Sequence, residues 1–350
     1  MNLQNKNISL NKNKIIVISG PTATYKTKIG IMLAKHLKND LKCDVNIINF
    51  DSLLFYKELS IGTAKPTERE KEGIIHHLMS IRSIREPMNA HDFVKIAEET
   101  ICKLQKINII PILIGGSGFY LRALISGMYD SPTTPEKIIN RSNKLFAKHG
   151  IKPFWDLLKR VDVESYNTLH FNDHYRIRRA IEHYWTTNFK FSSEKKKFES
   201  VLPAEIESNG NGESRNSRFG KIIHIHLDVP KEEHDKIIRK RIYLMMDNGF
   251  EEEVKLLLNN SNNVKDSTND NDFTGEEKPL KSVGYKEMVA FLRGEIKSKD
   301  ECIEKIFLST RHLAKAQRTW FKKVKDKMTC NPLDSEDIEK IKIVIKNAFV

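Results

Sequence analysis

The sequence predicts an α/β protein whose parallel sheet is covered by helices and interrupted by a helical insertion domain. In the first third of the chain, short apolar runs alternate with segments of helical periodicity. The next stretch shows only helical periodicity, and another apolar run follows about a hundred residues after the last one. Strands that are apolar on both faces are typical of parallel sheets between helices. We therefore expect core residues 1–130, an insertion with a mobile loop at 131–214, and the rest of the core with basic C-terminal helices at 215–350.

The expected elements follow from local patterns. Apolar runs predict the strands, and apolar residues at helical spacing, such as Ile29, Leu33 and Leu37, predict the helices. In chain order we expect strand 14–20, helix 26–41, strand 45–51, helix 89–106, strand 108–116, insertion helices 136–149, 153–161 and 172–185, strand 221–229, and helices 232–259, 286–293 and 298–327. The polar stretches 186–220 and 259–278 are expected to be mobile loops.

Composition excludes several classes of protein. With 39% hydrophobic and 30% charged residues over 350 positions, the chain is globular and needs no disulfides. Its four cysteines form no C-x-x-C pair and indicate reduced thiols in a cytoplasmic protein. The longest run without a charge, 107–121, is too short to cross a membrane, and residues 1–14 do not resemble a secretory signal. A net charge of +13 favours a polyanionic partner such as RNA, although biased codon usage would also enrich lysine.

A near match to the phosphate-binding loop G-x-x-x-x-G-K-[ST] lies between the first strand and the first helix. In such a loop, backbone N–H groups and the helix N-terminus hold phosphate oxygens, the lysine adds charge, and the hydroxyl can hold Mg²⁺. Tyr25 replaces the second glycine, so an ordinary strand-to-helix turn is the alternative. The motif predicts a P-loop NTPase-like core, with the phosphate on Gly20, Thr22, Ala23, Thr24, Tyr25, Lys26 and Thr27.

Asp51 ends the second strand, at the edge of the sheet where ligands of open α/β folds bind. Beside a phosphate loop, a carboxylate there can hold Mg²⁺ through water or act as a general base. The alternative is that Asp51 caps a helix beginning at Leu53.

Several further blocks resemble those of tRNA dimethylallyltransferases, the tRNA isopentenyltransferase family. The order and spacing of these blocks agree with those of the family from about residue 14 to 325. The blocks are the phosphate loop, Asp51-Ser52 with Phe55-Tyr56-Lys57, residues 61–67 (IGTAKPT), His76-His77-Leu78, residues 115–121 (GGSGFYL), Asn172-Asp173 with Arg176 and Arg179, residues 283–287 (VGYKE), and Thr310-Arg311 with Ala314-Lys315, Gln317 and Thr319-Trp320-Phe321.

The resemblance implies a prenyltransferase that moves a dimethylallyl group from dimethylallyl diphosphate to N6 of the adenosine immediately 3′ of the tRNA anticodon, with Mg²⁺ as cofactor. It implies that Asp51 accepts the proton of the amine, and that Lys26 and Arg241 bind the diphosphate beside a Mg²⁺ on Thr27. Without the resemblance, Arg241 would be a solvated helix charge.

We expect the insertion to bind the anticodon arm, and we expect the protein to be a monomer. The predicted tRNA-binding residues are Asp51, Ser52, Leu53, Leu54, Ser117, Tyr175, Arg176, Arg179, Arg311, Lys315 and Lys322.

Two basic stripes support RNA binding independently. Arg176, Arg179 and His183 share one face of the helix 172–185, opposite an apolar stripe. On the last long helix, basic residues follow 4-3-4-3 spacing at Arg311, Lys315, Arg318, Lys322 and Lys325. Either stripe could be a solvated face.

Three substrate-facing positions depart from the family pattern: Tyr25, Leu53-Leu54 in place of polar residues, and Tyr175 in place of glutamine. The alternatives are an adenylate isopentenyltransferase, a P-loop kinase or NTPase, and a tRNA-binding homologue with weakened catalysis. A kinase would not explain the C-terminal basic helix or the block at 61–67. Adjacent histidines such as His76 and His77 cannot project together as zinc ligands, so we interpret them as structural or substrate-positioning.

Overall fold

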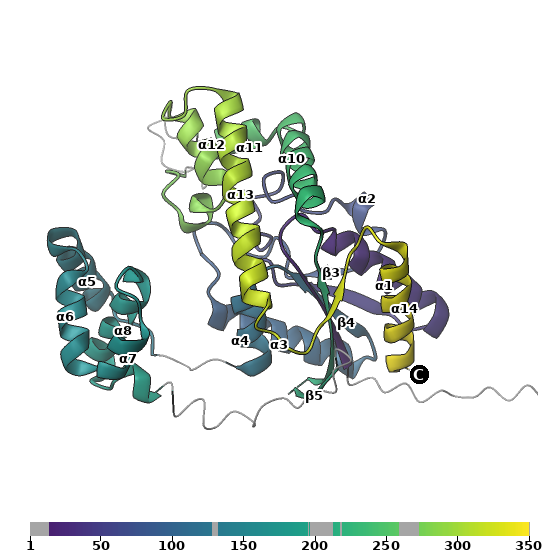
Figure 1. Cartoon of the computed structure of the whole chain (residues 1–350), viewed down its shortest axis with the longest axis horizontal. Helices are drawn as coiled ribbons and strands as arrows, with labels where there is room; N and C mark the ends of the chain where they lie inside the picture. Colours follow the sequence, from purple (N-terminus) through teal and green to yellow (C-terminus); the bar gives the residue numbers. More distant parts are fainter. Residues whose placement is uncertain are drawn as a thin grey trace, which may run out of the picture. The chain divides into compact units, whose positions relative to one another are not determined.

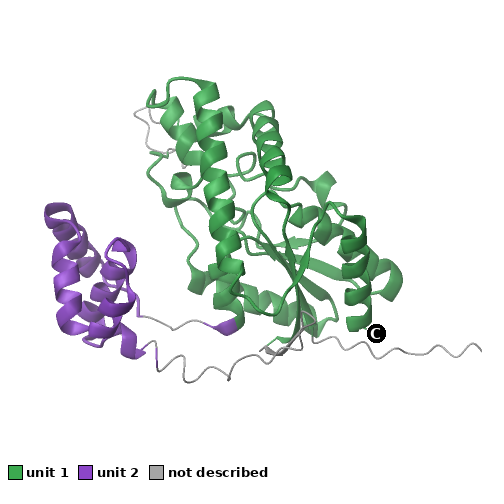
Figure 2. Cartoon of the chain, in the orientation of Figure 1, with its two compact units in different colours: residues 1–125, 206–350 green, residues 126–205 purple. Residues whose placement is uncertain are grey.

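The computed structural model describes residues 14–127, 132–194, 196, 213–217, 219–258 and 273–349. The chain divides into two compact units, residues 1–125 with 206–350 and residues 126–205 (Figure 2). The first unit is α/β and the second is entirely helical in the part that is described. The predicted α/β core with a helical insertion is therefore confirmed.

The α/β unit is built on one sheet with strand order β3-β2-β4-β1-β6-β5, and β7 also pairs with β6. All the pairs are parallel except β5 with β6. The strands are β1 (Lys14–Ser19), β2 (Val45–Asn49), β3 (His76–His77), β4 (Ile110–Gly115), β5 (Glu213–Ser217), β6 (Gly220–Leu227) and β7 (Met328–Cys330). The four predicted strands correspond to β1, β2, β4 and β6.

Helices cover both faces of this sheet (Figure 1). Along β1, Ile16 and Ile18 pack against α1 (Lys26–Leu41) and α14 (Ser335–Phe349). Ile15 and Val17 point to the other face, where they pack against α3 (Ala90–Lys106) and α4 (Gly118–Ser126). Because both faces are buried, the strand is apolar throughout. The short helix α2 (Glu68–Lys71) precedes β3.

A third apolar cluster joins Ala23 of the phosphate loop to four helices that follow β6. These are α10 (Lys231–Asp247), α11 (Phe250–Leu258), α12 (Tyr285–Leu292) and α13 (Lys299–Phe321), with the 3-10 helix η2 (Lys278–Lys281) before α12. The single helix predicted at 232–259 is wrong. It breaks at Gly249, whose φ of +92° lies outside the helical region and favours glycine.

Four of the helices described in the second unit pack around Phe154, Leu158, Ile177 and Ile181. They are α5 (Glu136–His149), α6 (Lys152–Val161), α7 (Val163–Thr168) and α8 (His174–Thr187), of which the sequence predicted all but α7.

The polar stretches lie partly outside the described residues, at 197–212 and 259–272. Where the first is described, β5 replaces part of the expected loop. Within the described residues, no helix combines the length and apolarity that a membrane span requires.

Candidate active site

The phosphate loop connects β1 to α1 and leaves a row of amide groups available. Within the described chain, none of the backbone N–H groups from Ala23 to Thr27 donates a hydrogen bond to another residue. The buried Thr24 hydroxyl donates to the Pro21 carbonyl at 2.9 Å and closes the turn. Free N–H groups at a helix N-terminus are what an anion-binding loop requires.

Lys26 folds back over this loop, and its Nζ donates to the Pro21 carbonyl at 2.5 Å. Burial lowers the pKa of Lys26 to about 8, the Asp51 carboxylate acts in the opposite direction, and Arg241 lowers it further. A buried ammonium with one carbonyl partner is poised to gain from a phosphate oxygen, because the anion replaces lost hydration.

Tyr25 occupies the position of the motif's second glycine and adopts a backbone conformation that suits glycine. Its backbone is left-handed, with φ 57° and ψ 22°, the region that glycine adopts most easily. The side chain is 39% exposed and caps no amide of α1. The loop therefore keeps a glycine-type conformation with a strained tyrosine in it.

Arg241 extends from α10 to the same loop. Its Nη1 donates to Thr22 Oγ1 at 3.3 Å and its Nη2 to the Thr63 carbonyl at 2.9 Å. Burial lowers the pKa of Arg241, and Asp51 partly offsets the effect. Two cations and one carboxylate thus interact electrostatically beside the phosphate loop.

Asp51 stands in a turn rather than at the start of a helix. Its backbone N–H donates to Asn49 Oδ1 at 2.8 Å, and its own Oδ1 accepts from the Leu53 N–H at 3.2 Å. No helix follows, so the helix-cap alternative is wrong. Among the described residues nothing donates to Oδ2, and the partly exposed carboxylate keeps one oxygen for a ligand.

The neighbouring predicted residues gather around this turn. Ser117, between β4 and α4, accepts a hydrogen bond from the Ser52 N–H at 3.2 Å. Leu53 and Leu54 are half-buried, and Leu53 packs against the third apolar cluster, the one formed with α10 to α13.

Sequence reasoning missed two residues that hold the loops of the site. Gln317 of α13 accepts from the Thr22 N–H at 2.8 Å and donates to the Gly116 carbonyl at 3.0 Å. Glu253 of α11 accepts from three successive N–H groups, Ser60 to Gly62, at 2.9, 2.7 and 3.1 Å, and from the Tyr285 hydroxyl at 2.7 Å. Glu253 thereby orders the segment that presents Thr63 to Arg241. The sequence blocks at 61–67 and 314–317 resemble those of the family, but the sequence alone does not show which distant residues they contact.

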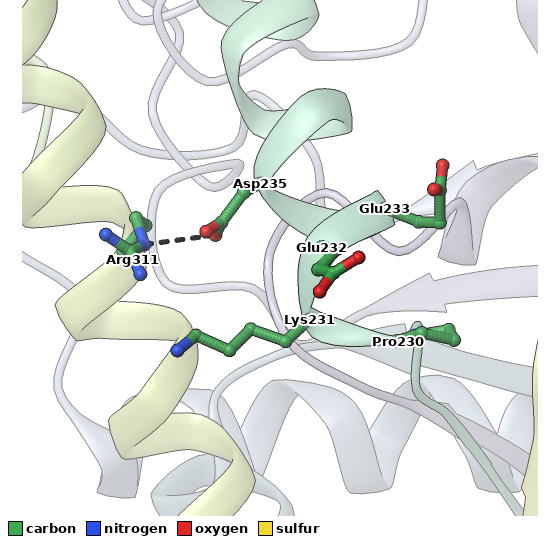
Figure 3. Close-up of a pocket in the computed structure, with 6 residues that line it drawn as sticks. All are labelled: Pro230, Lys231, Glu232, Glu233, Asp235 and Arg311. Carbon is green, nitrogen blue, oxygen red and sulfur yellow. Dashed lines mark ion pairs between the residues drawn. The ribbon is translucent and has the colours of Figure 1, made fainter.

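The predicted basic face of α13 is less basic than its spacing suggests. Arg311 pairs with Asp235 at 3.0 Å, beside a cavity of about 640 Å³ (Figure 3). Arg318 turns inward to Asp228 at 2.7 Å. Lys315 and Lys322 are exposed.

In the helical unit, Tyr175 is 74% exposed, and Arg176 is exposed and paired with Asp173. Arg179 donates to Thr134 at 2.9 Å and to the buried Glu182 at 3.1 Å. Including His183 in the basic stripe was wrong, because its side chain is buried and burial lowers its pKa.

The residues present fit a Mg²⁺ site completed by substrate. Thr27 Oγ1 has no hydrogen-bond partner among the described residues, and Asp51, which interacts electrostatically with the adjacent Lys26, offers a second hard oxygen. No group of three His, Cys, Asp or Glu side chains in the described ranges is arranged to hold a metal alone. Mg²⁺ commonly takes one or two protein oxygens and the rest from phosphates and water. His76 and His77 instead contact the Ile74 carbonyl at 2.8 Å and Asn46 at 2.9 Å.

This fold and site define a protein of the P-loop type, in which cations and free amides meet a carboxylate at the edge of a parallel sheet. The family model described as IPP transferase matches residues 54–324. The chain belongs to the IPP transferase family and is therefore an enzyme, a prenyltransferase.

Similar curated proteins agree with this assignment. A tRNA dimethylallyltransferase of Trichlorobacter lovleyi is 33% identical over 311 residues, which cover 89% of this chain and 91% of the relative. That of Staphylococcus aureus is 31% identical over 335 residues, covering 94% and 96%. These relatives decide against the kinase alternative.

Solved structures show the same fold. The full-length tRNA isopentenylpyrophosphate transferase of Bacillus halodurans superposes with a TM-score of 0.64 at 25% identity, over 96% of this chain and 97% of that one. A eukaryotic dimethylallyltransferase, described as acting on tRNA, superposes with a TM-score of 0.73 over 96% of this chain and 79% of that one. At 24% identity, this second likeness shows the fold alone.

Proposed function

We propose that the protein transfers a dimethylallyl group from dimethylallyl diphosphate to N6 of the adenosine immediately 3′ of the anticodon in tRNA and releases diphosphate. The observation that carries this proposal is the meeting of Lys26, Arg241 and Asp51 at the phosphate loop. The relatives named tRNA dimethylallyltransferase support the same reaction.

Each charged group has a role in this reaction. As the allylic C–O bond breaks, negative charge collects on the departing diphosphate, where Lys26, Arg241 and the free amides of the loop stabilise it. The adenine amine forms the new C–N bond and loses a proton to Asp51, which has an oxygen free to accept it. We propose that Thr27 helps to hold Mg²⁺, which when bound supplies further positive charge to the diphosphate.

We propose that tRNA binds to exposed basic and aromatic side chains. Lys315 of α13 and Lys322, the residue after this helix, are candidates for phosphate contacts, and Tyr175 with Arg176 is a candidate for the anticodon arm. The hydrogen bonds of the turn at Asp51 include Ser52, Leu53 and Ser117, and Leu54 follows in the chain. We propose that these four residues face the target adenosine. Arg179 and Arg311 already have acidic partners and would contribute less.

The four cysteines are free, which supports a cytoplasmic location as part of the proposal.

A matched pair of lysines on α1 tests the diphosphate role. Lys26→Ala should lower kcat/KM for dimethylallyl diphosphate by at least about a hundredfold, the scale on which removal of one preorganised charge acts. Lys28 is exposed on the same helix, and Lys28→Ala serves as the control. Steady-state kinetics with tRNA transcripts give the comparison, and tRNA affinity should not change in either variant. Equal activity of the two variants would contradict the assignment.

A further inference from the structure

The carbonyl of Thr22 in the phosphate loop is held from behind by a histidine of α10. His234 is 1% exposed, and its Nε2 lies 2.8 Å from that carbonyl oxygen. On the other side of the ring, Arg318 Nη2 lies 2.8 Å from His234 Nδ1. Because a guanidinium can only donate hydrogen bonds, Nδ1 must accept, and the ring proton must be on Nε2. The contact therefore fixes the neutral tautomer that donates to Thr22.

Arg318 is itself held in place. Its Nε donates to Asp228 Oδ1 at 2.7 Å, and its Nη2 also donates to the Val229 carbonyl at 3.0 Å. A continuous chain of hydrogen bonds thus runs from the end of β6, through α13 and α10, to the phosphate loop.

Holding one carbonyl determines the direction of the next amide. In a planar trans peptide, the carbonyl of Thr22 and the N–H of Ala23 point in opposite directions. The Ala23 side chain is buried, and its N–H has no hydrogen-bond partner in the described residues. This amide is the first of the free row that continues to Thr27.

We propose that His234 is a positioning residue for the diphosphate: held by Arg318, its Nε2–H fixes the Thr22–Ala23 peptide so that the Ala23 N–H faces the bound anion. This inference rests on the proposed function of the loop. It assigns a role to a side chain that touches neither substrate.

Charged groups on three elements face the His234 ring. Burial lowers the pKa of His234, Arg318 and Lys26 lower it further, and the Thr22 carbonyl and Asp228 raise it. The neutral donor form is therefore maintained at neutral pH. His234 and Arg318 also line a cavity of about 820 Å³ together with the exposed His312, which offers a matched control on the same cavity.

Two substitutions separate the two nitrogens. In His234→Gln the side-chain amide N–H reaches about as far as Nε2 and can still donate to Thr22, whereas His234→Asn can replace only Nδ1. The probe is inorganic pyrophosphate, titrated calorimetrically at pH 7.5 into the full-length protein. We expect His234→Asn to weaken binding about five- to tenfold, as the loss of one hydrogen bond predicts, with a matching rise in KM for dimethylallyl diphosphate and little change in kcat. His234→Gln and the control His312→Asn should stay within about twofold of the unchanged protein.

A second measurement needs no variant. In protein labelled with ¹⁵N-histidine, the long-range ¹H–¹⁵N spectrum at pH 7.5 should show His234 neutral with its proton on Nε2. The opposite tautomer or a charged ring would overturn the inference, and so would equal pyrophosphate affinities of the Asn and Gln variants. If either of these results is found, the proposed function nevertheless stands provided that Lys26→Ala abolishes pyrophosphate binding. Failure of the unchanged protein to bind pyrophosphate would overturn both.

Discussion

The strained tyrosine of the phosphate loop gives a prediction whose size follows from its backbone. Tyr25→Gly and Tyr25→Ala both remove the same partly buried ring, and only alanine keeps a Cβ at φ 57°. A left-handed non-glycine residue costs about 1–2 kcal/mol. The greater freedom of glycine in the unfolded chain offsets about 0.4–1 kcal/mol of that. The difference between the midpoints of these two ranges makes the glycine variant more stable than the alanine variant by about 0.8 kcal/mol.

Urea unfolding followed by Trp320 fluorescence measures this difference in the α/β unit, because the other two tryptophans, Trp155 and Trp185, lie in the helical unit and can be replaced by phenylalanine. The KM for dimethylallyl diphosphate should change severalfold at most in Tyr25→Gly, since Lys26 and the free amides remain. An alanine variant as stable as the glycine variant would refute the strain. An enzyme that is inactive until glycine is restored would refute the claim that the loop functions as found.

Four further outcomes follow from the site and the core. Asp51→Asn should keep tRNA affinity and lose at least about a hundredfold in turnover, and a near-normal rate would exclude Asp51 as the base. The affinity for dimethylallyl diphosphate should fall as the pH rises past about 8, because the pKa of Lys26 is about 8 and the charged form binds; a flat profile of KM from pH 7 to 9 would contradict this. Lys322→Ala should reduce the salt dependence of tRNA binding by about one phosphate contact and the ion-paired Arg311→Ala by less, as filter binding at several salt concentrations can show. Burial lowers the pKa values of the two histidines of β6 to about 3 and about 4, so the unfolded chain binds more protons below pH 6.5; stability should fall by about 1 kcal/mol per pH unit for each histidine between pH 6 and 5, and urea midpoints that do not change would disprove it.

Local patterns predicted the core, and elements that depend on distant partners were missed. The buried strands can be recognised from their apolar runs, and the start of the loop can be recognised from the glycine that follows the first strand. β7 has three residues and β5 has the sequence ESRNS, so neither carries an apolar alternation, and both exist by pairing with β6. The helix α14 was missed although Ile341, Ile345 and Phe349 repeat at helical spacing on its buried side.

The same distinction holds for the site. Lys26 belongs to the loop motif between β1 and α1, Asp51 follows β2 closely, and both could be predicted from the sequence. The side chains that hold the loop, His234 and Gln317, act on Thr22 from 212 and 295 residues away. The ion pair of Arg318 likewise depends on a residue 90 positions away, so a pattern of basic residues on one helix could not reveal it.

The central claim is the transfer of a dimethylallyl group to tRNA, and mass spectrometry of anticodon-loop nucleosides tests it most directly. Purified protein is incubated with unmodified tRNA, dimethylallyl diphosphate and Mg²⁺, with Asp51→Asn as the matched control. The account predicts N6-dimethylallyl adenosine at the position 3′ of the anticodon with the unchanged protein and little with the variant. Unmodified adenosine with the unchanged protein, while tRNA still binds, would contradict the account and favour a tRNA-binding protein without catalysis.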